Sequence, residues 1–379
     1  MEKRYLFTPG PTPVPPPVLA ALAEPVLHHR GPDFRLVYAS CLERLRSVFR
    51  TEREVLLFTS SGTGLLESAV ANLVSPGDRV LAVSAGYFGE RWAEIARAYG
   101  AEVDELSYPW GEAPSAADLA SRLDGHRLVL LTHSETSTGV VADVQALAAT
   151  AREAGALVAV DAVSSLGAVP LETDGWELDI VVSGSQKALM APPGVAMVAL
   201  SERAWAGRGS APRFYFDWER TREAQAQLDA VFTPATSLVV ALDAALGLLL
   251  EEGLEGAFER HLRLGRACRA GARAMGLELF SPDDDSASVV TAVRAPEGVD
   301  AGELVLTLRD RFGITLAPGQ GPLKGRVFRI GHIGWFDVFD ITTALAAVEL
   351  ALAEAGADVE RGVAVTAALD AFERPLTVA

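Results

Sequence analysis

Short apolar runs alternate with amphipathic stretches between residues 54 and 200 of this chain. Strands that are buried on both faces have such continuous apolar sequences, and their alternation with helices is typical of a parallel sheet covered by helices. The pattern therefore predicts an α/β fold with a mostly parallel, seven-stranded sheet. The strand candidates are residues 55–58, 79–83, 103–106, 128–131, 157–160, 180–182 and 195–200.

The pattern changes after two long helical stretches in the second half of the chain. A length of 379 residues is more than one core usually holds, so we expect two domains. We predict an N-terminal arm (1–20), a large domain (21–260) and a smaller C-terminal α+β domain (261–379). The expected helices are residues 64–74, 89–99, 144–154, 238–250, 254–275, 301–312 and 339–354, and the additional strands are 277–280, 289–293 and 327–330.

Prolines dominate the segment from Thr8 to Pro17. Proline restricts its own backbone and that of the preceding residue to non-helical conformations, so this segment must be extended. We expect it to lie across a surface rather than in a core, with a helix beginning near Val18.

Composition excludes several classes of protein. The formal net charge of −17 argues against a nucleic-acid-binding protein, which would carry a basic face. No apolar run approaches the roughly 18 residues of a membrane-spanning helix, and prolines break the N-terminus before a signal peptide could form. The distant cysteines Cys41 and Cys268 favour neither a disulfide framework nor a zinc site. We expect a cytoplasmic protein that binds neither nucleic acid nor membrane.

Lys187 is the most informative residue for function. It follows the apolar run 178–182 within a segment of small residues that leaves room for a ligand. A lysine at the end of a buried strand can have a lowered pKa and act as a nucleophile toward an aldehyde. Asp161 ends another predicted strand, where the structural alternative is a helix N-cap. A lysine that forms a Schiff base and an aspartate that pairs with a pyridinium are what a pyridoxal phosphate enzyme needs.

Polar or small residues follow three other strand candidates, at the end where open α/β sheets bind ligands. Residues 60–64 could bind an anion through backbone N–H groups, or only cap the next helix. They match neither the Walker motif nor the dinucleotide-binding motif. Residues 133–139 form a second polar segment. Phe88, in the third segment, could stack on a ring or fill the core.

Arg329 lies between apolar residues in a predicted strand, where a guanidinium needs an anionic partner. Its planar fork suits the carboxylate of a substrate, and the alternative is a structural ion pair. His28, His29 and Arg30 form a compact polar segment without further metal-ligand spacing, so we expect an ordered loop there and no metal site.

The order of these segments resembles that of the class V aminotransferases of fold type I, closest to the alanine–glyoxylate and serine–pyruvate aminotransferase branch. The resemblance covers nearly the whole chain. It implies the fold of the transferases that depend on pyridoxal 5′-phosphate (PLP), and a homodimer with shared active sites. The segments that carry it are residues 9–12, 61–63, 135–139, 161–167, 183–189 and 329–331.

The resemblance also implies a role for each matching residue. Lys187 would form the Schiff base with the cofactor, and Asp161 would pair with its pyridine nitrogen. Gly10 and Arg329 would bind the substrate, Arg329 through the α-carboxylate. Thr233 would reach the phosphate of the partner subunit, although the tyrosine that often precedes it in relatives is missing here. The other cofactor contacts would be Ser61, Gly62, Thr63, Phe88, Thr136, Val163, Ser185 and Gln186.

The predicted function is transfer of the amino group of a small L-amino acid, alanine or serine, to glyoxylate or pyruvate by a ping-pong mechanism. The alternative is the same chemistry with aspartate or ureidoglycine as donor, and a second guanidinium at Arg30 or Arg213 would favour a dicarboxylate. Cysteine desulfurase, a sister enzyme, is disfavoured because Cys268 falls in a helical stretch. A scaffold without activity is disfavoured because Lys187 and Asp161 are both present.

Overall fold

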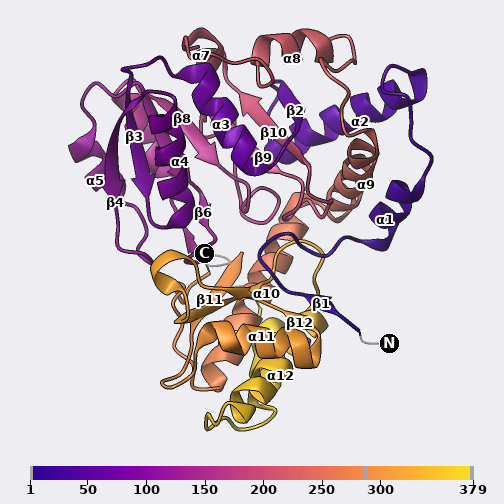
Figure 1. Ribbon diagram of the computed structural model, residues 1–379, viewed down its shortest axis with the longest axis vertical. Coiled ribbons are helices and arrows are strands. Elements are labelled where there is room, and N and C mark those ends of the chain that lie inside the picture. Colours follow the sequence, from indigo (N-terminus) through magenta and orange to yellow (C-terminus); the bar gives the residue numbers. More distant parts are fainter. Residues whose placement is uncertain (1–2, 286–288, 376–379) are drawn as a thin grey trace.

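The computed structural model describes residues 3–285 and 289–375 (Figure 1). A sheet with helices on both faces lies above a smaller C-terminal unit in this view. The sheet has seven strands, in the order β2-β10-β9-β8-β5-β3-β4. Their bounds are β2 (Val55–Thr59), β10 (Val195–Leu200), β9 (Ile180–Gly184), β8 (Leu157–Asp161), β5 (Leu128–Thr132), β3 (Arg79–Ser84) and β4 (Glu102–Ser107).

The strands of this sheet are parallel except for β10, which is antiparallel to both of its neighbours. The prediction of a mostly parallel, seven-stranded sheet is therefore confirmed. In the register, Thr132 of β5 pairs with Asp161 of β8, and Asp161 pairs with Val182 of β9. The carboxyl ends of these strands meet at one edge, and Asp161 lies there.

Alternate strand side chains pack against helices on opposite faces of the sheet. Leu57 and Leu81 belong to the core on one face, and Leu56 and Leu130 to the core on the other. The first face is covered by α1 (Pro16–Ala23), α2 (Pro32–Phe49), α5 (Ala116–Arg122), α6 (Val144–Glu153) and α9 (Thr236–Glu252). The second is covered by α3 (Gly62–Leu73), α4 (Tyr87–Ala98), α7 (Glu202–Ala206) and α8 (Trp218–Gln225).

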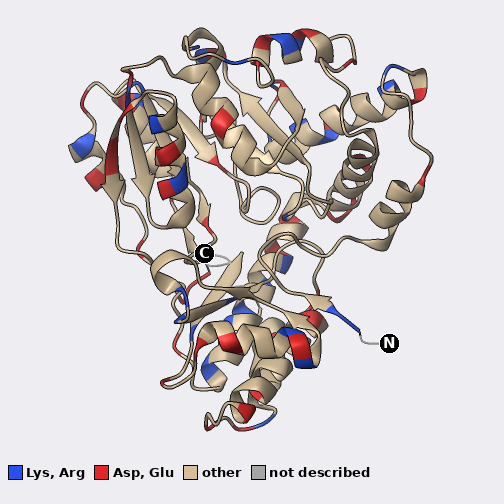
Figure 2. Ribbon diagram, viewed as in Figure 1, with Lys and Arg blue, Asp and Glu red and all other residues tan. Residues whose placement is uncertain are grey.

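Charged residues lie mostly on helices and loops (Figure 2). The adjoining strands β2, β10, β9, β8 and β5 contain one charged residue among them, Asp161. A carboxylate inside an apolar sheet is costly unless it is paired or hydrogen-bonded, so this residue requires an explanation from the site.

The C-terminal unit has a core of its own. β11 (Val290–Arg294), β14 (Val327–Gly331) and β13 (Ala317–Pro318) form an antiparallel sheet. α10 (Leu254–Ala274) joins the two cores, because Ala257 packs in the core of the large sheet and Leu264 packs in the C-terminal core. The remaining elements are α11 (Ala301–Phe312), β12 (Ile314–Thr315), η1 (Gly321–Leu323), α12 (Val338–Glu354) and α13 (Val363–Glu373).

The N-terminal arm is anchored to this unit. β1 (Tyr5–Leu6) pairs in parallel with β12, and the next residue, Phe7, is 1 % exposed within the C-terminal core. Pro9 and Thr12 are also buried while Pro11 is exposed, so the arm is partly buried in the protein rather than only laid on its surface as predicted. The extended segment is shorter than predicted because α1 begins at Pro16, and the fixed φ of proline suits the first turn of a helix.

Several elements differ from the sequence-based expectation. α3 and α4 begin at Gly62 and Tyr87, slightly before the predicted starts. Residues 277–280 form only an isolated bridge, between Leu279 and Val293, instead of a strand. The sequence patterns did not predict α2, α5, α8 or α13. Among residues 3–285 and 289–375, no helix has the length and apolar composition that crossing a bilayer requires.

Candidate active site

Lys187 lies in the loop between β9 and β10 and is 9 % exposed. Its Nζ donates a hydrogen bond to the carbonyl oxygen of Pro9, 2.8 Å away. A Cβ on Gly10 would lie 2.3 Å from Lys187 Cε, so the arm can pass this close only because residue 10 is a glycine. Burial lowers the pKa of Lys187 to about 8, while the charge of Asp161 opposes the shift. The neutral, nucleophilic amine is thus far more populated at neutral pH than in an exposed lysine.

Asp161 ends β8 and is 6 % exposed. Its Oδ1 accepts a hydrogen bond from the N–H of Val163 at 2.9 Å, and turns rather than a helix follow, so it is not a helix N-cap. Burial raises the pKa of Asp161 to about 6, the charge of Glu135 adds to the shift, and that of Lys187 opposes it. The carboxylate is therefore held in a place where a cationic partner would stabilise it.

The N-terminus of α3 lies beside Asp161. Ser61 caps this helix, with its Oγ accepting from the N–H of Gly64 at 3.2 Å. Gly62 is buried against Val163, because a Cβ at residue 62 would lie 2.7 Å from Val163 Cγ2. The exposed Thr63 follows. The first turn of a helix has N–H groups without intrahelical partners and a partial positive charge, so it suits a phosphate.

Phe88 lies in the first turn of α4 and is half-buried. The Arg91 guanidinium carbon lies 5.0 Å from the centroid of the Phe88 ring. Arg91 also donates from Nη1 to Thr63 Oγ1 at 3.1 Å. This contact joins the ring to the N-terminus of α3, which favours the stacking interpretation of Phe88 over a role in filling the core.

Arg329, in β14, is 5 % exposed and is held by carbonyl oxygens. Its Nη1 donates to Thr136 O at 2.7 Å, and Nη2 and Nε donate to Pro318 O at 2.9 and 3.2 Å. Within the described part of the chain, no carboxylate forms an ion pair with it, so the structural ion pair is not found. Burial lowers the pKa of Arg329 to about 10, and the charge of Glu135 opposes the shift. A buried, oriented guanidinium of this kind suits a substrate carboxylate.

The remaining predicted contacts are less uniform. Thr136 is buried, with Oγ1 3.3 Å from Ser164 Oγ. Ser185 uses its hydroxyl hydrogen on Pro192 O at 2.5 Å. Gln186 Oε1 is buried and has no hydrogen-bond partner in the described structure. Thr233 is exposed, and no hydrogen bond joins it to these residues in the described parts.

The two guanidinium groups that sequence offered as a second carboxylate site are engaged elsewhere. Arg213 Nη1 donates to the carbonyl oxygens of Gly209 and Ala211, both at 3.1 Å. Arg30 lies 3.8 Å from Asp229 in an ion pair beside the exposed loop of His28 and His29. The other alternative residue, Cys268, is buried in α10, and burial raises its pKa to about 11.

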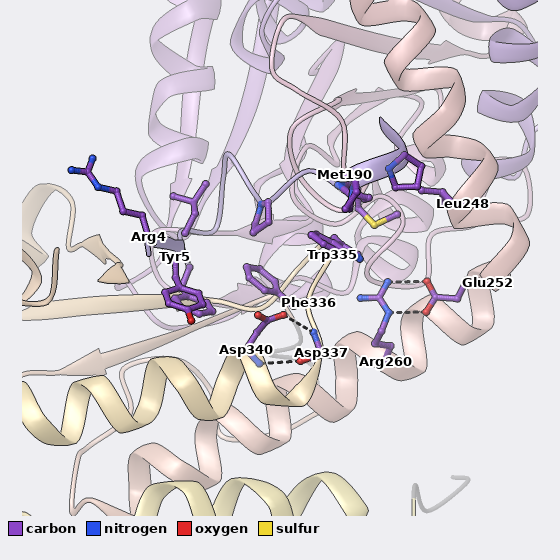
Figure 3. Close-up of a pocket in the computed structure, with 16 residues that line it drawn as sticks. Arg4, Tyr5, Met190, Leu248, Glu252, Arg260, Trp335, Phe336, Asp337 and Asp340 are labelled. Carbon is purple, nitrogen blue, oxygen red and sulfur yellow. Dashed lines mark hydrogen bonds and ion pairs between the residues drawn. The ribbon is translucent and has the colours of Figure 1, made fainter. Parts of the chain in front are cut away.

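A pocket of about 750 Å³ lies apart from this cluster. Figure 3 shows Trp335 and Phe336 in its wall, with Arg260 joined to Glu252 by two hydrogen bonds. The arm, α9, α10 and Met190 form the other walls, and Lys187, Asp161 and Arg329 are not among its lining residues.

Sequence reasoning missed three contributors. Glu135 lies in the predicted polar segment 133–139 without a predicted role, and the sequence predicted no role for Arg91 or for the carbonyl of Pro9. Arg91 follows Phe88 by one helical turn, a spacing that could have indicated the contact. The contacts of Glu135 and Pro9 join segments far apart in the chain, and no local pattern reveals them.

Comparisons with known proteins agree with this site. The sequence matches the family model "Aminotransferase class-V" over residues 4–324. A soluble hydrogenase small subunit from Synechococcus is 43% identical over 94% of this chain and 94% of that protein. An L-aspartate–glyoxylate aminotransferase from Paracoccus denitrificans is 37% identical over 99% and 97% of the two chains. A serine–glyoxylate aminotransferase from Methylorubrum extorquens is 36% identical over 100% and 98%.

A solved structure shows the same fold. The ureidoglycine–glyoxylate aminotransferase of Bacillus subtilis has a TM-score of 0.93 and 33% identity to this chain, over 99% of each chain. This chain therefore belongs to the class V aminotransferases. The predicted family, the fold of the PLP-dependent transferases and the enzyme class are confirmed.

Proposed function

We propose that this aminotransferase uses PLP and moves the amino group of alanine or serine to glyoxylate or pyruvate. The observation that carries the proposal is that Lys187, Asp161 and Arg329 form one buried cluster. The charges of Asp161 and Arg329 act on the pKa of Lys187, and the charge of Lys187 acts on the pKa of Asp161. The lysine has a pKa lowered to about 8, and the aspartate one raised to about 6. Burial is the main cause of both shifts, and perturbed pKa values of buried titratable groups cluster at functional sites.

The residues present fit the cofactor. Gly10 and Gly62 allow the backbone to approach Lys187 and Val163 closely, and Gln186 presents a buried oxygen without a partner among the described residues. Ser61, Gly62 and Thr63 would hold the phosphate at the N-terminus of α3.

Each side chain of the cluster has a chemical task. When bound, PLP supplies an aldehyde that takes up the amino group and a ring that withdraws electrons from the substrate. Lys187 Nζ would bind that aldehyde and later move the proton of the substrate's α-carbon. Asp161 would keep the ring nitrogen protonated, and Arg329 would orient the α-carboxylate. Phe88 and Val163 would cover the two faces of the ring.

The donor is tested by a panel of alanine, serine and aspartate against glyoxylate, pyruvate and 2-oxoglutarate. We expect the largest kcat/KM with alanine or serine and glyoxylate, and parallel lines in double-reciprocal plots, since the two half-reactions share one site. A larger kcat/KM with aspartate would favour the alternative donor, which the relative from Paracoccus supports. Purified protein that stays colourless after incubation with PLP would contradict the proposal as a whole.

The hydrogenase name of the cyanobacterial relative gives a separate outcome to check. Hydrogen uptake with a dye acceptor can be measured on the same preparation. We expect none above the rate of a Lys187→Ala variant, because the buried lysine and aspartate carry amino transfer.

A homodimer, three segments and a cytoplasmic location complete the proposal. Ala257 packs in the core of the large sheet and Leu264 packs in the C-terminal core, which supports a division near residue 260. The proposed segments are the arm at 1–20, the large domain at 21–260 and the small domain at 261–379. The exposure of Thr233 leaves it accessible to a partner subunit. Sedimentation of the protein at several concentrations tests the dimer, and a monomer with full activity would contradict it.

A further inference from the structure

We infer that Glu135 is a positioning residue that fixes the ring-stacking side chain Phe88 and the carboxylate-binding side chain Arg329 relative to each other. This inference rests on the proposed function, which assigns those two roles. Glu135 belongs to a short hairpin, β6 (Ser134–Glu135) and β7 (Val140–Val141), that follows β5, and it is 2 % exposed. Nothing in the proposed chemistry uses it as an acid or a base.

Both carboxylate oxygens of Glu135 accept hydrogen bonds. Oε2 accepts from the backbone N–H groups of Phe88 and Gly89, at 3.0 and 3.2 Å. Oε1 accepts from the N–H of Ser137 at 3.1 Å and from its hydroxyl at 2.5 Å. Ser137 Oγ in turn accepts from the N–H of Tyr87 at 3.1 Å. Burial raises the pKa of Glu135, and the hydrogen bonds from Ser137, Gly89 and Phe88 oppose that shift because they favour the charged carboxylate, which only accepts.

These bonds cap α4 with a residue from a distant part of the chain. The residue before the helix, Gly86, has no side chain that could do so, and a Cβ there would lie 2.6 Å from Glu135 Cγ. The first turn of α4, with Phe88 in it, therefore has its position set by Glu135. The negative charge at the helix N-terminus adds a favourable interaction with the helix dipole.

The same residue also reaches the substrate side of the site. Glu135 is followed directly by Thr136, whose carbonyl oxygen accepts from Arg329 Nη1 at 2.7 Å. The Glu135 carbonyl oxygen accepts from the N–H groups of Thr138 and Gly139, at 3.1 and 2.8 Å, which holds the turn that aims this carbonyl. One buried side chain and its own backbone thus link the two walls of the site.

Glutamine cannot replace this carboxylate without loss. Its amide has one oxygen and one NH₂ group, and the NH₂ group would face either the N–H groups of Phe88 and Gly89 or the N–H of Ser137. Whichever way the amide turns, its NH₂ group faces backbone N–H donors at a buried site. A Glu135→Gln substitution therefore releases one end of the link while keeping the shape of the side chain.

Glu349 supplies a matched control. It is also a buried glutamate at a helix N-terminus, 5 % exposed, and its two oxygens accept from the N–H groups of Gly362 and Ala364 at 2.8 and 2.7 Å. It caps α13 in the C-terminal unit, whereas the proposed site residues lie elsewhere. Glu349→Gln measures the general effect of losing a buried capping charge, and any additional effect of Glu135→Gln belongs to the site.

The first measurement uses cofactor-free protein and amide hydrogen exchange. We expect Glu135→Gln to speed exchange at Phe88 and Gly89 by about tenfold or more, the effect of losing a hydrogen bond to a charged acceptor. Glu349→Gln should speed exchange at Gly362 and Ala364 instead. Wild-type protection of Phe88 and Gly89 in the Glu135→Gln variant would overturn the inference, whatever the protein's activity.

The second measurement uses PLP and the substrates. We expect Glu135→Gln to raise the Kd for PLP by about tenfold, to raise the KM of the amino donor, and to change the visible circular dichroism of bound PLP, since a hydrogen bond to a charged group is lost. Glu349→Gln should match wild type in all of these. Equal behaviour of the two variants would overturn the inference, whereas failure of the wild type to bind PLP would contradict the proposed function.

A milder variant covers the case in which Glu135→Gln does not fold. Ser137→Ala removes one donor to Glu135 and the acceptor for Tyr87, and leaves the bonds to Phe88 and Gly89 in place. We expect smaller changes in the same direction for exchange and for the Kd of PLP. No change in either quantity would count against the link.

Discussion

Two buried aspartates lie at opposite edges of the large sheet, and their surroundings differ sharply. Asp179 directly precedes β9 at the amino edge and is fully buried. Its Oδ1 accepts from Ser201 Oγ at 2.7 Å, and its Oδ2 accepts from Val158 N at 3.1 Å. Arg203 Nη1 lies 3.0 Å from Oδ2, and Arg152 Nη1 lies 3.5 Å from Oδ1.

Asp161, at the carboxyl edge, has far fewer partners. Its side chain accepts a hydrogen bond from the N–H of Val163, and burial raises its pKa to about 6. The comparison shows that the fold can neutralise a buried carboxylate fully when it only has to stabilise the sheet. At the carboxyl edge, the proposed site would use the charge of Asp161 to bind a cationic group of a ligand. The predictions below test whether substitutions at the carboxyl edge reduce activity, and whether a substitution at the amino edge reduces stability alone.

The largest effect is expected at the carboxyl edge, for Lys187→Ala. We predict at least about a thousandfold loss of kcat, because the variant has neither the covalent attachment point nor the proton carrier. Initial rates of amino transfer check this. The chain has two other lysines, Lys3 and Lys324, both exposed, so Lys324→Ala is a matched control that should keep wild-type rates. Substantial turnover by Lys187→Ala would break the comparison at its main point.

At the amino edge, Asp179→Asn should affect stability and not chemistry. The variant leaves two arginines around an uncharged group, and breaking a buried charge pair costs about 3 kcal/mol of unfolding free energy. Urea unfolding measures the loss. Once folded, the variant should have a wild-type kcat/KM, and a specific loss of activity would show that the amino edge also serves the reaction.

At the carboxyl edge, Asp161→Asn should shift stability in the opposite direction. The folded pKa of about 6 lies above the ordinary aspartate value of 3.8, so the native state retains the proton to higher pH than the unfolded state does. The contribution of Asp161 to stability is therefore fully present below about pH 4 and is lost as pH rises through 6, a loss of about 3 kcal/mol once Asp161 is charged. Asp161→Asn removes that cost. The cofactor-free variant should be more stable than cofactor-free wild type at pH 7.5, and this difference in stability should vanish near pH 4.

The activity of Asp161→Asn distinguishes the loss of a charge that the site needs from a simple gain in packing. The variant should lose kcat while it gains stability, since the ring nitrogen loses its charged partner. Urea midpoints and rates measured on one preparation give both quantities. A variant that is less stable than wild type at pH 7.5 would mean that Asp161 is satisfied in the fold, as Asp179 is.

A smaller effect is expected for Arg329→Ala, across the site from the sheet. Losing one charge-assisted carboxylate contact should weaken the binding of amino and keto acids by about 1.5–3 kcal/mol, so KM rises. Steady-state kinetics with the donor and the acceptor check this. Arg30→Ala removes an exposed ion pair with Asp229 and should leave KM unchanged. Equal KM values for wild type and Arg329→Ala would refute the role of Arg329.

The sequence predicted the sheet because its inner strands are buried on both faces and therefore largely apolar, whereas β4 at one side of the sheet is only partly buried and carries three acidic residues. It also placed Lys187 and Asp161 correctly at strand ends, since strand boundaries follow from the same apolar pattern. It could not show that Phe88 lies inside α4, because the cap of that helix is Glu135, a residue from another part of the chain. The burial of Pro9 and Phe7 was missed for a similar reason: a proline-rich segment has an extended backbone whether or not other elements cover it.

The smallest effect is expected for Ser61→Ala, which tests the N-terminus of α3 at the same carboxyl edge. Ser61 is exposed and its Oγ accepts from Gly64 N, so losing the cap should reduce the unfolding free energy by about 1 kcal/mol. If Ser61 also holds the phosphate, the Kd for PLP rises as well, because the hydroxyl is one of its donors. Ser115→Ala removes the equivalent cap of α5, where Ser115 accepts from Asp118 N at 3.1 Å. That control should lose similar stability and keep the wild-type Kd; equal Kd values for both variants would reduce Ser61 to a helix cap.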